Sequence, residues 1–519
     1  MATYNNPGVY VSESPLVTNA RRSNLAQATA CFFGTAPRGP LDATFISSWS
    51  EYKSYYGDIS PTDELGYSVY HYFANGGRDA YVVRVLHETT AGNTTQAVVG
   101  SASVPFYPQG SGASAGEALL FDVQAKSKGL WGNSLTVTTE AYSTSNAYPA
   151  VGTASQQYLY NLVVSFGGVE VERWNGVCSD PAHNRFVKTV VNTYSKYITI
   201  PTTSWPSAVV GAQPKTTPVS LGGGTNGSAV VSSDYVAAIS SKLSTIEGAL
   251  IMNAPGITDQ VVITQLNTTA TSRGNSFVVV DPSTSNSETT ISTLVATYPQ
   301  SSYLGVYYPM LVMVDPTKTG PGAIRDTYPG GAVVGAIVRT DATRGVYKAP
   351  AGYDVDIRNC LGLVTTFTPT ETGKMYSEGG INLFKAIPGG GVVINGARSL
   401  DKVGPGKYIP IRRSLNYLKQ ALTDATAFAV FEPNDERLWT RLNMTISSIL
   451  SEFWRSGGLK GSNAAQAFYI ICDETNNTAT TINNGEVRIE VGVALQYPAE
   501  FIVINLSQWT GGSNTVSTL

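Results

Sequence analysis

The stretch AFAVFEPNDERLWTRLNMTISSILSEFWRSGG, residues 427–458, determines how the C-terminal region is interpreted. Its first five residues, 427–431, are predicted to form a short apolar strand. A helix is predicted over residues 434–456, because apolar residues recur at helical spacing while charged residues occupy the opposite face. Asn434 is the expected N-cap, and Gly457-Gly458 ends the helix. One helix face is therefore expected to pack, while the other is free to bind a partner.

Further strands are predicted after this helix. Residues 467–472 are an apolar run that would complete a parallel β-α-β unit with a right-handed crossover. Residues 487–495 alternate between apolar and other residue types, which is typical of a strand with one buried face. Residues 501–506 are apolar on both faces. The region 427–509 is therefore predicted to form one compact α/β unit.

Several ordered segments of the chain resemble one protein family. At the C-terminus these segments are AFAVFEPNDERLWTRL, CDETNN and YPAEFIVI, and near the N-terminus they are GTAPRGP, SWSEYKSYYG and GGRDAYVVRV. Together they resemble contractile tail sheath proteins, which build the contracting sleeve of phage tails, R-type bacteriocins and bacterial contractile injection systems. The resemblance implies a structural subunit that polymerises as stacked, six-membered rings around an inner tube protein. Such a sheath contracts to drive the tube through a cell envelope, and baseplate and tail-terminator proteins are its further partners.

The chain is predicted to be a multidomain α/β protein. Residues 27–86 and 396–509 are expected to pack together as one discontinuous assembly domain. The resemblance implies a subtilisin-like fold for the central domain. The predicted ranges are an N-terminal arm (1–26), the first part of the assembly domain (27–86), an inserted β-rich domain (87–221), a central α/β domain (222–395), the second part of the assembly domain (396–509) and a C-terminal tail (510–519).

The central region contains three apolar runs, each halted by a proline. They are predicted as strands over residues 250–255, 277–282 and 310–316, which favours a largely parallel sheet covered on both faces. Farther on, a strand is predicted over residues 408–411 and a helix over residues 412–421. The paired Arg412 and Arg413 either lie in a solvated first turn of that helix or bind a carboxylate across an interface.

Motifs for catalysis are weak in this chain. GGGTNG at residues 222–227 matches GxGxxG but lacks a strand directly before it and a helix directly after it, so it is interpreted as a linker. A Ser-His-Asp site in the central domain needs an imidazole, and the three histidines all precede that domain. Asp281 and Asp315 are interpreted as strand-terminating acids. No catalytic residue, cofactor or metal ligand is predicted, and the four cysteines lack paired spacing.

The composition is low in charge. Charged residues make up 14% of the chain, below the roughly 25% of ordinary soluble proteins, which suits a protein that covers much of its surface with copies of itself. A net charge of -3 gives no reason to expect nucleic acid as a partner. No apolar run approaches the roughly 20 residues of a membrane span, so membrane insertion is not expected. Assembly in a bacterial cytoplasm, as part of a phage virion tail or a contractile injection particle, is expected.

Three surfaces are candidates for assembly contacts. The first is a short extended arm without a local partner, as strand addition to another subunit requires; its residues are Pro7, Gly8, Val9, Tyr10 and Val11. The second is an acceptor sheet for that arm, with residues Val487, Ile489, Val491, Val493, Phe501 and Val503. The third is the polar face of the predicted helix 434–456, whose arginines would meet acidic groups on the inner tube; they are Arg437, Arg441 and Arg455.

Two other functional classes stay open. A non-contractile surface protein or capsid-type structural protein also suits the Gly-, Thr- and Ser-rich composition. A subtilisin-like hydrolase is disfavoured by the missing histidine in the central domain.

Overall fold

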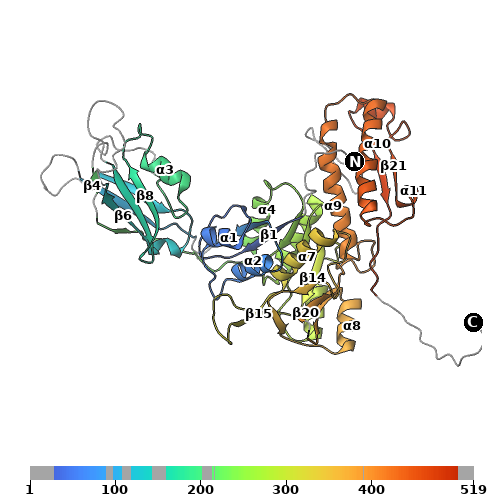
Figure 1. Cartoon of the computed structure of the whole chain (residues 1–519), viewed down its shortest axis with the longest axis horizontal. Helices are drawn as coiled ribbons and strands as arrows, with labels where there is room; N and C mark the ends of the chain where they lie inside the picture. Colours follow the sequence, from blue (N-terminus) through green and yellow to red (C-terminus); the bar gives the residue numbers. More distant parts are fainter. Residues whose placement is uncertain are drawn as a thin grey trace, which may run out of the picture.

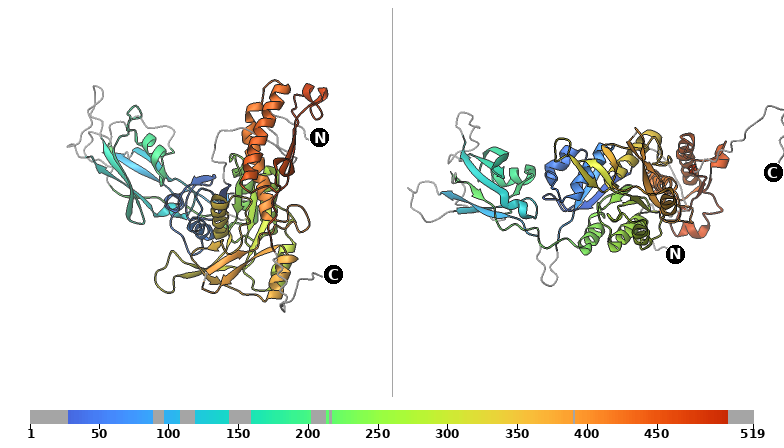
Figure 2. Two further views of the ribbon diagram at one scale, coloured as in Figure 1. Left: turned by 45° about the vertical axis from the view of Figure 1, so that its right-hand side comes forward. Right: turned by 90° about the horizontal axis from the view of Figure 1, so that it is seen from below.

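The structure is a computed structural model that describes residues 28–88, 97–107, 119–142, 159–201, 213–214, 217–389 and 391–500. The predicted N-terminal arm, the predicted strand over residues 501–506 and the predicted C-terminal tail lie outside these residues. The described chain has a mixed α/β fold in three parts: a β-rich lobe, a central α/β part and a C-terminal unit (Figure 1). These parts follow one another along the long axis of the molecule (Figure 2).

A nine-stranded sheet forms the central part, in the order β17-β20-β19-β14-β13-β12-β1-β3-β2. Neighbouring strands from β3 to β19 in this order pair parallel. At the edges, β2 pairs antiparallel with β3, β20 with β19 and β17 with β20. The strands are β1 (Thr29–Gly34), β2 (Thr44–Ile46), β3 (Ala80–Arg84), β12 (Leu250–Asn253), β13 (Phe277–Val280), β14 (Leu304–Tyr308), β17 (Asp356–Ile357), β19 (Ile381–Ile387) and β20 (Gly391–Asn395).

Helices cover both faces of this sheet, which explains why its strands are apolar on both sides. One face packs against α1 (Trp49–Tyr56), α2 (Glu64–Ala74) and α7 (Gly330–Arg344). The other packs against α4 (Ser232–Lys242), α5 (Gln260–Arg273), α6 (Glu288–Ala296) and α8 (Pro369–Ser377). Helices α2 and α7 approach so closely at Gly331 that an added Cβ would lie 2.1 Å from the Ser68 carbonyl oxygen. None of the described helices has the length and apolarity needed to cross a membrane.

The pairing of the N-terminal strands corrects one prediction. Residues 27–86 were expected to pack with the C-terminal unit, but β1 lies between β3 and β12 in the central sheet, with Thr29 opposite Leu250 and Ala30 opposite Ala80. The physical reason is burial: consecutive residues Ala30, Cys31, Phe32 and Phe33 are all fully buried and alternate between the two cores of the sheet.

A second correction concerns the predicted strand over residues 310–316. Strand β15 (Leu311–Val314) does not join the parallel sheet; it forms a separate antiparallel sheet with β16 (Ile324–Thr327) and β18 (Cys360–Leu363). Its residues alternate between buried and half-buried, whereas those of β14, just before it, are all buried. Only β14 therefore has the two buried faces that a place in the central sheet requires.

The β-rich lobe contains two four-stranded sheets around one core. Gly167 and Gly168 form a two-residue hairpin turn, with φ of 57° and 84°. The predicted linker over residues 222–227 is wrong in part, because Gly222 bridges Ser101 and Thr225 bridges Val98 of the lobe. The elements are β4 (Ser101–Tyr107), β5 (Leu119–Ala125), β9 (Ile198–Thr199) and β10 (Gln213–Pro214) in one sheet, β6 (Leu135–Ala141), β7 (Tyr160–Phe166), β8 (Val169–Val177) and β11 (Val219–Ser220) in the other, and α3 (Val187–Tyr194).

Arg84, at the end of β3, joins the central part to the lobe. Its side chain is almost fully buried, and its guanidinium donates to backbone carbonyls on both sides of the junction: those of Ala36, Pro37 and Gly39 in the central part, and that of Lys128 in the lobe. Burial lowers its pKa to about 10, so it remains charged at neutral pH. Beside it, the Arg38 guanidinium lies 4.4 Å from the centroid of the Tyr197 ring of the lobe.

We expect Arg84→Met to loosen this junction. The variant keeps an apolar side chain but leaves buried carbonyls without their donor, so the unfolding free energy should fall by about 2–4 kcal/mol. Urea denaturation measures this loss, and limited proteolysis should cut faster between the lobe and the central part. Arg78→Met, at an exposed arginine, is the control. Equal stability of the two variants would contradict the role assigned to Arg84.

Candidate functional site

Helix α9 (Ile409–Thr426) connects the central sheet to the C-terminal unit. Ile409 is fully buried against the sheet, whereas Leu418 and Leu422 belong to the core of the C-terminal unit. The predicted strand over residues 408–411 is wrong, because Pro410 sits in the first helical turn, where proline is well tolerated. One continuous helix therefore contributes to both cores, which fixes the C-terminal unit on the central part.

The predicted strand over residues 427–431 is also wrong. It is a short 3-10 turn, η4 (Ala427–Ala429), that connects α9 to α10 (Glu436–Arg455). Phe431 follows with a left-handed φ of 68° and a side chain that is 87% exposed. An apolar run this short fits a strand and a helix end equally well by periodicity, so only the fold distinguishes them. The predicted parallel β-α-β unit therefore does not form.

Helix α10 follows the predicted range closely, with a corrected cap. The N-cap is Asp435, whose carboxylate accepts from the backbone N–H groups of Arg437 and Leu438. The Asn434 side chain does not cap the helix. Its oxygen accepts from Trp439 Nε1 at 2.8 Å, and its Nδ2 donates to the Glu486 carbonyl at 3.0 Å. Asn434 thus binds the start of α10 to the segment that precedes the next strand.

A β-hairpin packs beside α10. Strands β21 (Phe468–Ile471) and β22 (Glu490–Val493) pair antiparallel, with Phe468 opposite Val493 and Ile471 opposite Glu490. The Tyr469 ring covers Gly492 across the pair, where a Cβ would lie 2.0 Å from the ring. The predicted alternation over residues 487–495 is visible here, since Val491 is buried against the C-terminal core while Glu490 is exposed.

This hairpin contains the described part of the predicted acceptor sheet. Ile489, Val491 and Val493 pack on the C-terminal core and Val487 is half-buried, whereas Phe501 and Val503 lie outside the described residues. Among the described residues no third strand joins the hairpin, although an isolated bridge between Leu459 and Leu495 lies just beyond β22. Its outer edges therefore offer backbone N–H and C=O groups to an added strand. The arm predicted to pair there, residues 7–11, lies outside the described chain.

The three arginines predicted to face a tube lie on α10 and are exposed. Arg437, Arg441 and Met444 follow one another at helical spacing on the solvent side, and Arg455 continues this stripe in the last turn. The Arg441 guanidinium lies 4.1 Å from the centroid of the Phe428 ring. Within the described chain these arginines form no ion pair that neutralises them. Their positive charge is therefore available to a partner.

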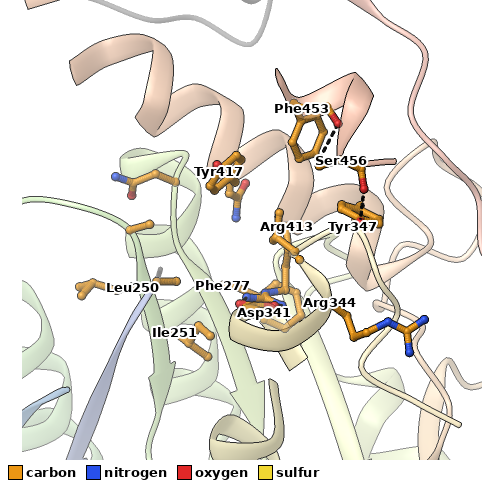
Figure 3. A pocket seen from close by; sticks show the side chains of 16 residues that line it. Leu250, Ile251, Phe277, Asp341, Arg344, Tyr347, Arg413, Tyr417, Phe453 and Ser456 are labelled. Carbon is orange, nitrogen blue, oxygen red and sulfur yellow. Dashed lines mark hydrogen bonds and ion pairs between the residues drawn. The ribbon is translucent and has the colours of Figure 1, made fainter. Parts of the chain in front are cut away.

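A cavity of about 320 Å³ lies where the central sheet meets the C-terminal unit (Figure 3). Leu250, Ile251 and Phe277 line it from the sheet, and Tyr417 and Phe453 line it from α9 and α10. Ala28, the first described residue, is also part of its wall. The predicted N-terminal arm is therefore attached to the chain at this junction.

A buried ion pair closes the same junction. Arg413 of α9 binds Asp341 of α7 with two hydrogen bonds, one of 2.9 Å between Nη1 and Oδ1, and the two side chains are 3% and 5% exposed. Arg412 is buried too and donates to Asn416 Oδ1 at 3.1 Å. The solvated first turn is therefore wrong, and the carboxylate that Arg413 binds belongs to its own chain.

The polar groups at the end of the central strands hold the fold together. Asp281 accepts from the Gly330 backbone N–H at 2.7 Å and from Asn253 Nδ2 at 3.1 Å, and burial raises its pKa to about 6. The histidine argument from the sequence misses His71, which α2 places in the central part. Both His71 ring nitrogens lack a hydrogen-bond partner in the described structure, so His71 forms no nucleophile–base pair there. Among the described residues, no cluster of three or more metal-ligating side chains occurs.

Comparison with known proteins finds relatives in sequence. Residues 405–508 match the family profile of the phage tail sheath C-terminal domain. The chain is 27% identical over 177 residues to the tail sheath protein of Vibrio phage KVP40. This match covers 34% of this chain and 25% of that protein. It is 29% identical over 159 residues to the tail sheath protein of Enterobacteria phage T4. This match covers 30% of this chain and 23% of that protein. The chain thus matches about a quarter of the length of these curated relatives.

Solved structures match nearly the whole chain. The sheath of the extracellular contractile injection system PVC, in the contracted state, has a TM-score of 0.57 and 19% identity over 98% of this chain and 99% of that chain. The helical sheath of the anti-feeding prophage in the contracted state has a TM-score of 0.56 and 18% identity over 98% of this chain and 100% of that chain. The sheath tail protein of Listeria innocua has a TM-score of 0.59 and 13% identity over 88% of this chain and 90% of that chain. The predicted resemblance to contractile tail sheath proteins is confirmed.

We expect the junction between α9 and α7 to depend on the Arg413–Asp341 pair. Arg413→Met leaves the Asp341 carboxylate buried without its partner and should cost about 3–5 kcal/mol of unfolding free energy. Arg413→Met combined with Asp341→Leu removes both charges and should recover most of this loss. Urea denaturation of the full chain compares the two variants. A double variant as unstable as the single one would show that the ion pair is not what holds the junction.

Proposed function

We propose that this chain is the structural subunit of a contractile sheath, because residues 405–508 match the phage tail sheath C-terminal domain and the fold is similar to that of a contractile injection system sheath. It polymerises as stacked, six-membered rings around an inner tube protein and contracts to drive that tube through a target cell envelope. The observation that best supports this is the open-edged hairpin β21–β22, held on the helix pair α9–α10. An exposed sheet edge on a rigid support is a template for strand addition from another copy.

The linkage between neighbouring subunits uses the N-terminal arm. In this proposal Pro7, Gly8, Val9, Tyr10 and Val11 add a strand to the hairpin of the next subunit. The polar residues 19–26 form the tether, and about eight extended residues span roughly 26 Å at about 3.3 Å each. The tether starts at the cavity between the central sheet and the C-terminal unit, since Ala28 lines that cavity. Backbone hydrogen bonds then keep neighbours connected while their rigid surfaces slide.

The energy for contraction is stored in the assembly. Two packings of the same folded subunit exist, the contracted one is favoured, and a baseplate event releases the extended one. About 5.5 kcal/mol moves a two-state equilibrium from 1:99 to 99:1, and neighbours that switch together need less apiece. The subunit is not an enzyme in this proposal, and its central domain is a subtilisin-like scaffold. The hydrogen bonds of Asp281 to Asn253 and Gly330 support a structural role for that sheet edge.

The partners follow from this assembly. They are further copies of the chain, the inner tube protein, and baseplate and tail-terminator proteins at the two ends. Assembly takes place in a bacterial cytoplasm, and the product is part of a phage virion tail or of a contractile injection particle.

Electron microscopy of the purified chain separates this function from a capsid-type or surface-layer role. A sheath subunit is expected to form helical sleeves with an open bore that shorten and widen on contraction. Closed shells or flat lattices would contradict the proposal and favour a capsid or surface protein instead.

We expect removal of residues 1–14 to give a folded, soluble subunit that no longer forms sleeves. Val9→Pro should act similarly, because proline removes one donor from the added strand. Asn19→Pro, in the tether, is the control, since no ladder hydrogen bond is proposed there. Negative-stain microscopy and circular dichroism provide the measurements. If the truncated chain forms long sleeves that contract intact, the linkage lies elsewhere.

We expect the exposed arginines of α10 to bind acidic groups on the inner tube. Arg437→Glu with Arg441→Glu should weaken co-assembly with the tube while tube-free sleeves still form, most clearly at low salt. Arg358→Glu with Lys402→Glu, a matched reversal at exposed positions in the central part, should have little effect. Co-sedimentation with the inner tube measures binding. Unchanged binding at low salt would contradict the proposed contact between these arginines and the tube.

A further inference from the structure

We infer that Arg398, Tyr376 and Tyr408 form a clamp on Glu500 that attaches the C-terminal end of the chain to the central sheet. Tension on residues 501–519 from a second copy would then act on the sheet and not on the hairpin β21–β22. This inference rests on the proposed sheath function, because only a sliding assembly pulls on that end of the chain.

The clamp holds Glu500 through three side chains. Arg398 makes two parallel bonds to the carboxylate, of 2.9 Å from Nε to Oε1 and of 2.5 Å from Nη2 to Oε2. The Tyr376 hydroxyl donates to Oε1 at 2.5 Å and the Tyr408 hydroxyl to Oε2 at 3.3 Å. The Arg398 and Glu500 side chains are 7% and 11% exposed. A buried, bidentate and charge-assisted contact is among the strongest that one carboxylate can make.

The surrounding groups keep Glu500 charged. Burial opposes its ionisation, but hydrogen bonds from Arg398 and Tyr376 outweigh this and hold its pKa below the usual range. The Arg398 guanidinium also lies 4.3 Å from the centroid of the Tyr376 ring. The clamp is therefore complete at neutral pH.

The clamp is connected directly to the central sheet. Asn382 is fully buried in β19, and its side-chain amide bonds the Arg398 backbone in both directions, each bond being 2.7 Å long. The same Nδ2 also donates to the Val306 carbonyl of the neighbouring strand β14 at 3.1 Å. Force on Glu500 therefore passes through Arg398 into two strands of the nine-stranded sheet.

The segment between the hairpin and the clamp is more exposed and makes weaker contacts than the clamp. Of residues 496–499, Gln496, Tyr497 and Ala499 are exposed and Pro498 is half-buried. The Gln496 N–H makes a long bond of 3.4 Å to the Gly458 carbonyl, and the Tyr497 ring contacts Tyr408 of the clamp. The weakest part of this path thus lies between β22 and Glu500. A pull from beyond Glu500 meets the clamp first and spares the hairpin.

Glu500→Gln tests the clamp in the full chain. The variant keeps the shape and an acceptor oxygen of the side chain and removes its charge, so the contact with Arg398 should weaken. Urea denaturation checks that the chain still folds before sleeves are counted. We expect extended sleeves of normal length, and on triggered contraction at least a tenfold rise in the number of breaks per sleeve, counted by electron microscopy. Tyr376→Phe removes one donor and keeps the ion pair, so it should give a smaller rise. Glu170→Gln, the same change at an exposed lobe residue that also accepts two bonds from one arginine, Arg173, should contract like the wild type.

The outcomes distinguish this inference from the proposed function. If wild-type chain forms no contracting sleeves, the proposed function fails, whatever the clamp does. If wild-type sleeves contract and Glu500→Gln and Tyr376→Phe sleeves contract equally intact, the clamp carries no tension and the inference fails. If the Glu500→Gln and Tyr376→Phe variants do not assemble while Glu170→Gln does, the clamp serves assembly and the inference is likewise overturned.

Discussion

The central position of β1 in the nine-stranded sheet is the constraint on which the rest of the structure depends. Its four buried residues, 30–33, need partners on both faces and on both edges, and only a place between β3 and β12 provides them. At one end of β1, Ala28 lies at the cavity below the C-terminal unit. At the other end, the loop after Gly34 receives hydrogen bonds from Arg84 and meets the β-rich lobe. One buried strand thus determines where the proposed arm leaves the subunit and where the lobe is attached.

The C-terminal unit depends on this sheet through α9. The helix contributes Ile409 to the central core and Leu422 to the C-terminal core, and Arg413 fixes its first turns to α7 through Asp341. A hairpin of only two strands is marginal by itself, and the α9–α10 pair supplies the apolar surface that β22 needs. The result is a short sheet with open edges on a rigid support, which suits repeated pairing with other copies.

Buried polar groups hold separate parts of this chain together. Arg84 joins the lobe, Asp281 joins α7 to the ends of the central strands, and Arg398 joins Glu500 to β19. Each makes several hydrogen bonds to groups that are distant in sequence, so each costs little to bury. Such contacts suit a subunit whose parts must stay together while its interfaces with neighbours change.

The sequence by itself determined the local elements and the family resemblance. The helix over residues 434–456 and the strands over residues 250–255 and 277–282 were all predicted, because glycines and periodicity act over a few residues. The exposed arginines of α10 also follow from helical spacing alone. Only the tertiary structure decided which strands are neighbours, since strand pairing depends on contacts between residues far apart in the chain. It placed β1 in the central sheet, excluded a strand over residues 427–431, made β21 and β22 antiparallel and buried Arg413 against Asp341. A short apolar run or an arginine pair fits several environments equally well, and burial against a distant partner selects one of them.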